Sequence, residues 1–113
     1  STFGVRVSIP GYAPYAAAKA GVINLVRALA TELAPTVRVN AVAPGVVETA
    51  FLKGGTGQRE KHERIDPAQF AASVPLQRVA QPADIVGPLL FLIGPGSSYM
   101  TGQTLHVNGG IWS

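Results

Sequence analysis

Apolar residues recur at helical spacing in the first half of the chain. They are separated by three or four positions, as one buried helix face requires: Ala20, Ile23, Val26, Leu29 and Leu33. This pattern predicts one long helix over residues 12–34. Pro14 lies near the start of this helix, where proline is tolerated, and Pro35 ends it.

Two shorter stretches have the composition of strands. Residues 37–43 are rich in β-branched side chains and are bounded by Pro35 and Pro44, which predicts a buried strand. Because a long helix precedes it, we expect this strand to belong to a parallel sheet. Residues 104–108 predict a final strand, which a pair of glycines ends.

A second firm helix is predicted over residues 82–93, where apolar side chains cover more than one helix face. Such breadth indicates burial against a partner as well as against the sheet. Asp66 and Pro67 predict the N-cap and the first residue of a shorter helix that continues to about Ser73.

Residues 46–77 are the least regular part of the chain. A long, partly helical excursion between core elements is typical of a lid or binding segment, so we interpret residues 46–77 as a substrate-binding lid. The overall order is loop, helix, strand, insertion, helix and strand. That order corresponds to the latter half of a sheet built from βαβ units.

Composition narrows the class of protein. A length of 113 residues suits one small domain, and 47% hydrophobic with 13% charged residues indicates a core-rich globular fold. No apolar run reaches the roughly 18 residues of a membrane span, and no signal-peptide pattern opens the chain. Cysteine is absent, which fits a cytoplasmic protein. Since the first residue is not methionine, we expect the chain to start inside a longer protein.

The charges do not indicate a nucleic-acid or metal site. The net charge is +3, and the basic residues are scattered or mixed with acids, as in residues 59–64, which is typical of a solvated helix face. The chain has two histidines and no clustered carboxylates, so no metal ligand set is predicted. We expect no nucleic acid and no membrane among its partners.

Tyr15 and Lys19 carry the candidate chemistry. They lie four positions apart in an alanine-rich run, which places them on one face of a helix. A fixed ammonium near a phenol favours the phenolate, so such a pair can donate a proton to a carbonyl or take one from an alcohol. By itself the spacing also fits two residues on a solvated helix surface.

Several motifs, in this order, resemble the C-terminal half of a short-chain dehydrogenase/reductase of the Rossmann-fold family. They are Ser1-Thr2-Phe3-Gly4, Tyr15-Ala16-Ala17-Ala18-Lys19, residues 39–49 with their Pro44-Gly45 turn, Arg78 with Pro82-Ala83-Asp84-Ile85, and Tyr99-Met100-Thr101-Gly102-Gln103 with Val107-Asn108-Gly109-Gly110. The resemblance implies an α/β fold, the C-terminal half of a Rossmann-type doubly wound parallel sheet. Residues 1–113 would then be part of a single NAD(P)-binding domain whose glycine-rich dinucleotide-binding half is absent.

The resemblance also implies catalytic roles. Tyr15 would be the general acid in carbonyl reduction and the base in alcohol oxidation, and Lys19 would favour its phenolate and bind the nicotinamide ribose. Ser1 would hydrogen-bond the substrate oxygen, because it lies three residues before Gly4 as in the family pattern. Thr2, thirteen residues before Tyr15, also carries a hydroxyl and is the alternative.

Four further residues would contact the cofactor, NAD or NADP. Pro44 and Gly45 would shape the floor under the nicotinamide. The backbone of Val47 and the hydroxyl of Thr49 would bind its carboxamide or a neighbouring phosphate. Thr49 has the alternative role of a helix N-cap. Arg78 is expected either to mark the entry of the following helix or to anchor the insertion through carbonyl groups.

The function implied is reversible hydride transfer between NAD(P)(H) and a carbonyl or secondary alcohol in a small, fairly apolar substrate. The family implies a homotetramer or homodimer that uses the long helix, the helix over 82–93 and the last strand. We expect the chain by itself to be inactive. The alternative is a non-catalytic assembly or regulatory module that kept the fold.

Overall fold

The computed structural model describes residues 1–2, 10–50 and 66–111. Residues 51–65 of the expected lid and Phe3-Gly4 of the serine segment lie outside these ranges. The described chain forms, in order, helix α2 (Ala13–Leu33), strand β1 (Ala41–Pro44), helix α3 (Pro67–Ala71), helix α4 (Pro82–Ile93), the 3₁₀ helix η2 (Pro95–Ser97) and strand β2 (Thr104–Val107).

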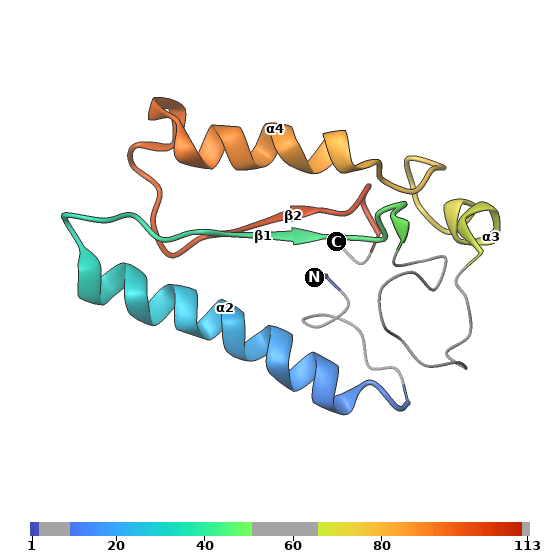
Figure 1. Cartoon of the computed structure of the whole chain (residues 1–113), viewed down its shortest axis with the longest axis horizontal. Helices are drawn as coiled ribbons and strands as arrows, with labels where there is room; N and C mark the ends of the chain where they lie inside the picture. Colours follow the sequence, from blue (N-terminus) through green and yellow to red (C-terminus); the bar gives the residue numbers. More distant parts are fainter. Residues whose placement is uncertain (3–9, 51–65, 112–113) are drawn as a thin grey trace.

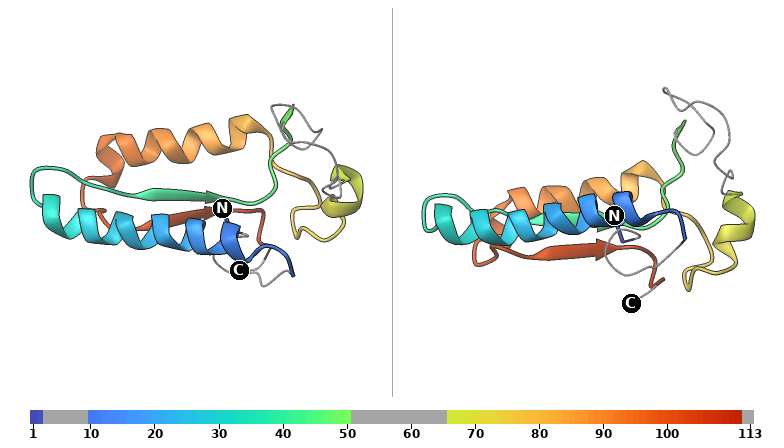
Figure 2. Two further views of the ribbon diagram at one scale, coloured as in Figure 1. Left: turned by 60° about the horizontal axis from the view of Figure 1, so that its bottom comes forward. Right: turned by 90° about the horizontal axis from the view of Figure 1, so that it is seen from below.

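The two strands form a parallel sheet with a long helix on each face. β1 pairs with β2 from Ala41 opposite Thr104 to Pro44 opposite Val107. Helices α2 and α4 lie on opposite sides of this sheet, and α3 lies beyond the carboxyl ends of the strands (Figure 1). The same layers are visible when the molecule is turned (Figure 2). The predicted α/β class with a parallel sheet is confirmed.

Helix α2 buries a narrower stripe than the apolar spacing predicts. Its bounds, Ala13–Leu33, agree with the expected 12–34, with Pro14 in the first turn. Ile23 and Ala30 are buried, but Ala20 is exposed and Leu33 is 42% exposed. The helix is about 32 Å long, whereas a four-residue strand covers about 13 Å. Four-residue strands are therefore too short to cover the whole length of the helix.

Helix α4 has the predicted bounds, Pro82–Ile93, and its first residue is proline. Its apolar side chains are less buried than their breadth suggests. Leu90 is 62% and Ile93 77% exposed, so one apolar face is uncovered within the described chain. No helix in the described ranges combines the length and the apolarity that crossing a membrane requires.

Strand β1 begins at Ala41 rather than at Val37. Before Ala41, hydrogen bonds that involve side chains take the place of regular backbone pairing between the strands. The Asn40 amide donates to the Met100 carbonyl at 2.9 Å, and its oxygen accepts the Gln103 amide N–H at 3.0 Å. The Val39 N–H donates to the Thr101 hydroxyl at 3.1 Å. Regular pairing starts only after these contacts.

Arg38 connects the segment that precedes β1 to the end of α4. Its guanidinium donates to the carbonyls of Leu92, Ser97 and Met100 at 3.1, 2.7 and 3.1 Å. A cation at this place adds a charged donor to carbonyls at and just after the end of α4. It holds the loop after α4 against the start of β1.

Candidate active site

Tyr15 and Lys19 lie together on the first turns of α2. The Lys19 ammonium Nζ lies 5.5 Å from the centroid of the Tyr15 ring. Tyr15 is 41% exposed, so its side chain is accessible and does not point into the core. The structure thus places the phenol and the cation on one accessible helix face, as the four-residue spacing predicts.

Tyr12 is a neighbour of this pair that the sequence analysis did not single out. Its ring meets the Tyr15 ring edge-on, with centroids 6.3 Å apart and planes at 85°. This is a preferred aromatic geometry. The spacing of three residues was the available signal, although Tyr12 itself lies at the N-cap of α2.

Ser1 and Thr2 have different surroundings. Thr2 is fully buried; its amide donates to the Pro44 carbonyl at 2.9 Å and its hydroxyl to the Ala43 carbonyl at 3.1 Å. Ser1 is half-buried. Thr2 is therefore held to β1 by two hydrogen bonds, whereas Ser1 is only half-buried.

Pro44 and Gly45 end β1 in close contact with the segment after β2. The Gly45 amide donates to the Val107 carbonyl at 3.0 Å, which extends the ladder by one bond. A Cβ at Gly45 would lie 3.0 Å from Cα of Asn108. Only glycine lets the two backbones approach so closely.

Val47 pairs with Ala80 as an isolated parallel bridge. The Val46 carbonyl accepts the Ala80 amide N–H at 3.0 Å, and the Glu48 amide donates to the Ala80 carbonyl at 2.8 Å. In a parallel bridge of this kind the amide and carbonyl of Val47 itself point to the opposite edge. Thr49 is exposed and is followed by Ala50, the last described residue of this range.

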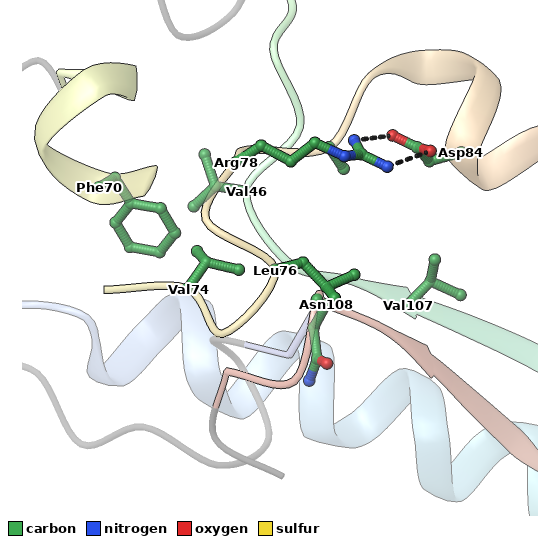
Figure 3. A pocket seen from close by; sticks show the side chains of 10 residues that line it. Val46, Phe70, Val74, Leu76, Arg78, Asp84, Val107 and Asn108 are labelled. Atoms are coloured by element: carbon green, nitrogen blue, oxygen red, sulfur yellow. Dashed lines mark hydrogen bonds and ion pairs between the residues drawn. The ribbon is translucent and has the colours of Figure 1, made fainter. Parts of the chain in front are cut away.

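An apolar cavity of about 150 Å³ lies at the carboxyl ends of both strands. Figure 3 shows Phe70 of α3 pointing toward Val46 and Val74, with Leu76 and Val107 on the sheet side. Arg78 and Asp84 form part of its wall. Tyr15 and Lys19 are not among its lining residues.

Arg78 binds mainly a carboxylate in the first turn of the following helix and also one carbonyl. Its guanidinium donates to both oxygens of Asp84, at 2.6 and 2.9 Å, and to the Val79 carbonyl at 3.3 Å. This bidentate bond, with a further one from the Gln81 amide, lowers the pKa of Asp84 to about 2. The pair joins the end of the insertion to the first turn of α4.

The side chains of this site are not those of a metal centre. Within residues 1–2, 10–50 and 66–111, no group of three or more His, Cys, Asp or Glu side chains is placed to hold a metal ion. The chemistry of the site is instead that of hydroxyl groups beside a cation.

Comparison with known protein families identifies the family of this chain. A family model described as enoyl-(acyl carrier protein) reductase matches residues 1–112. The chain belongs to the short-chain dehydrogenase/reductase family.

Similar sequences within this family include bacterial reductases. The chain is 42% identical over 103 residues to "3-oxoacyl-[acyl-carrier-protein] reductase FabG" of Vibrio cholerae, covering 90% of this chain and 39% of that protein. It is 43% identical over 112 residues to the protein of the same name from Chlamydia trachomatis, covering 98% of this chain and 42% of that protein.

Solved structures of short-chain dehydrogenase/reductase proteins have the same fold. A short-chain dehydrogenase/reductase from Brucella melitensis superposes with a TM-score of 0.78 at 34% identity, covering 100% of this chain and 41% of that one. An NADPH-bound short chain oxidoreductase from Pseudomonas aeruginosa, described as having an atypical catalytic center, superposes with a TM-score of 0.71 at 38% identity. This match covers 84% of this chain and 37% of that one. The chain therefore spans about two fifths of the length of the relatives it matches.

Proposed function

We propose that the full-length protein containing this chain catalyses reversible hydride transfer between NAD(P)(H) and a carbonyl or secondary alcohol, with Tyr15 handling the proton. The observation that carries the proposal is the Lys19 ammonium 5.5 Å from the Tyr15 ring centroid, on an accessible helix face. In this proposal Lys19 has the role of favouring the phenolate that forms when the proton leaves. Loss of the phenol proton is the step that requires catalysis near neutral pH.

Each side chain of the site then has one task. In reduction Tyr15 donates its hydroxyl proton to the carbonyl oxygen, and in oxidation it takes the alcohol proton. Ser1 donates a hydrogen bond to the same oxygen and holds it near the phenol. We assign this task to Ser1 rather than Thr2 because the Thr2 hydroxyl is already donated to Ala43 inside the sheet.

The residues after β1 fit a nicotinamide cofactor. The Val47 amide and carbonyl face away from Ala80 and offer one donor and one acceptor, which suits a carboxamide. Pro44 and Gly45 would form the floor beneath the ring, the Thr49 hydroxyl would bind the carboxamide or a phosphate, and Lys19 would bind the ribose. When bound, the nicotinamide supplies or accepts the hydride. NAD and NADP both remain candidates.

The substrate that we propose is a 3-oxoacyl thioester or a similar apolar ketone. The FabG relatives are named for a 3-oxoacyl substrate on an acyl carrier protein, and the cavity beside α3 is lined mainly by apolar side chains. The reacting centre in such a substrate is a CH–OH or C=O carbon. We place residues 46–77 over this substrate as its lid.

We further propose a cytoplasmic homodimer or homotetramer. Large apolar side chains are exposed on both long helices, among them Leu25 on α2 (55%) and Ile93 on α4 (77%). A second copy of the chain would cover them. The chain by itself is expected to be inactive, since it spans about two fifths of its relatives.

Replacing the phenol tests this function directly. In the full-length protein, Tyr15→Phe should lower the rate of NAD(P)H oxidation with a 3-oxoacyl thioester by about 10²–10⁴-fold, because it removes only the acidic oxygen. The fully exposed Tyr99 offers a matched control, Tyr99→Phe, which should leave the rate unchanged. Equal rates in the two variants would overturn the proposal and favour a non-catalytic assembly or regulatory module.

A further inference from the structure

The segment after β1, residues 46–48, is joined to the chain just before α4 by backbone hydrogen bonds. The Val46 carbonyl accepts the Ala80 amide N–H at 3.0 Å, and the Glu48 amide donates to the Ala80 carbonyl at 2.8 Å. Val47 lies between these two bonds, so its own amide and carbonyl point to the opposite edge. The proposed function assigns these two groups to the nicotinamide carboxamide.

A side-chain hydrogen bond joins the same two segments a second time. The Gln81 amide Nε2 donates to Glu48 Oε2 at 2.7 Å, across 33 positions of the sequence. Glu48 is half-buried and Gln81 is exposed. A hydrogen bond to a carboxylate is stronger than one between two neutral groups. This bond therefore holds Glu48, the residue between Val47 and Thr49, against the start of α4.

Gln81 is itself held in place at the start of α4. Its backbone N–H donates to a carboxylate oxygen of Asp84 at 2.7 Å. The same carboxylate accepts two hydrogen bonds from Arg78, as Figure 3 shows. The Gln81 side chain therefore reaches Glu48 from a backbone position that the Arg78–Asp84 pair supports.

The location of the Glu48–Gln81 bond favours a role in ligand binding over one in stability. Substitution of an exposed residue such as Gln81 usually has little effect on the free energy of unfolding. A group that binds a ligand, in contrast, has to be held within roughly 0.5 Å of its productive position. Because Glu48 adjoins Val47, a bond at the Glu48 side chain limits how far the Val47 backbone shifts.

We propose that Glu48 and Gln81 are positioning residues, whose side-chain hydrogen bond holds the Val47 amide and carbonyl where they bind the nicotinamide. This inference rests on the proposed function and deepens it. When the bond is broken, the segment also adopts positions that do not bind. The apparent dissociation constant of the cofactor then rises by the factor by which the competent fraction falls.

An exchange of the two side chains tests the bond in the full-length protein. Gln81→Ala removes the donor, and Gln81→Glu places two carboxylates opposite each other. Each should raise the dissociation constant of NADPH or NADH, measured by calorimetry, by about tenfold, the order expected for the loss of one hydrogen bond to a charged group. The double variant Glu48→Gln with Gln81→Glu restores an amide–carboxylate pair in the reverse direction and should restore the affinity.

A matched control separates the bond from the added charge. Ala83→Glu places the same negative charge on an exposed residue in the first turn of α4, two positions after Gln81. It should leave the affinity for the cofactor unchanged. If Ala83→Glu weakens binding as much as Gln81→Glu does, or if the double variant binds no better than Gln81→Glu, the inference is overturned.

A ligand without the nicotinamide shows which part of the cofactor the bond serves. ADP-ribose, or its 2′-phosphate for a protein that prefers NADPH, keeps the adenine, both riboses and the pyrophosphate. Gln81→Ala should leave its dissociation constant unchanged, because the Val47 groups contact only the nicotinamide. Equal weakening of both ligands would show a general effect on the fold and would contradict the positioning role.

The kinetic constants separate this inference from the proposed function. With a 3-oxoacyl thioester, Gln81→Ala should raise the KM for NAD(P)H more than it lowers kcat, whereas Tyr15→Phe should lower kcat. Affinity that falls in Gln81→Ala and returns in the double variant supports the positioning role even if Tyr15→Phe keeps its rate. Affinity for NAD(P)H that is the same in all variants counts against the positioning role even if Tyr15 proves catalytic.

Discussion

The Thr2 hydroxyl donates to the carbonyl of Ala43, 41 positions later in the chain, at 3.1 Å inside the sheet. Thr2 therefore holds this segment to β1, whereas the half-buried Ser1 is the residue to which we assign the substrate contact. Function and stability should respond to different substitutions.

Ser1→Ala in the full-length protein should lower kcat/KM by about a hundredfold, the usual effect of losing one hydrogen-bond donor to a reacting oxygen. The melting temperature should not change. Thr2→Val, which keeps the shape but removes the hydroxyl, should instead destabilise the fold by about 1 kcal/mol. Steady-state kinetics and thermal unfolding distinguish the two. A loss of activity in Thr2→Val at unchanged stability would transfer the substrate contact to Thr2.

Gly45→Ala should destabilise the fold by about 1–3 kcal/mol, because the new Cβ would lie 3.0 Å from Cα of Asn108 and the two backbones must separate. Gly21 offers a control, since a Cβ there meets nothing within 4 Å. Gly21→Ala lies inside α2 and should be neutral or stabilise by up to about 1 kcal/mol. Chemical denaturation of both variants measures the difference, and equal effects would contradict the close contact.

Arg38→Met should cost about 2–3 kcal/mol of stability, because it leaves the carbonyls of Leu92, Ser97 and Met100 without their charged donor. Methionine keeps most of the apolar stem, so the effect reports the lost hydrogen bonds. The exposed Arg27 is the matched control, and Arg27→Met should change stability by less than about 0.5 kcal/mol. Urea titration compares the two, and similar midpoints would refute the role of Arg38.

The Arg78–Asp84 pair predicts how stability depends on pH. The pKa of Asp84 falls from 3.8 to about 2 in the folded chain, mainly through the hydrogen bonds from Arg78. A carboxyl with a lowered folded-state pKa stabilises the fold above its unfolded value, and this contribution is lost as pH falls through the folded value. The melting temperatures of the wild type and Asp84→Asn should therefore differ by a constant amount near neutral pH.

That difference should shrink only as pH falls from 3.8 toward about 2, where Asp84 becomes protonated. Calorimetric scans at several pH values measure it. Because the pair is at the surface, added salt should also reduce the difference. A difference that vanished already near pH 6 would show that Asp84 is not held by Arg78 in the folded protein.

Features that depend on neighbouring residues were predictable from the sequence. The bounds of α4, the capping of α3 by Asp66 and the common face of Tyr15 and Lys19 all follow from spacing along a helix and from proline positions. These contacts span at most four residues, so local geometry determines them. The parallel sheet was also predictable, because a long helix precedes the first strand and another helix lies between the two strands.

Tertiary structure alone decided the contacts between distant segments. Arg38 reaches Ser97 across 59 positions, Asn40 replaces the ladder before β1, and Thr2 rather than Ser1 is fastened to Ala43. The cavity likewise needs four segments at once. No periodic pattern encodes such contacts, because they arise only when the chain folds and each buried polar group takes a partner that lies near it in space.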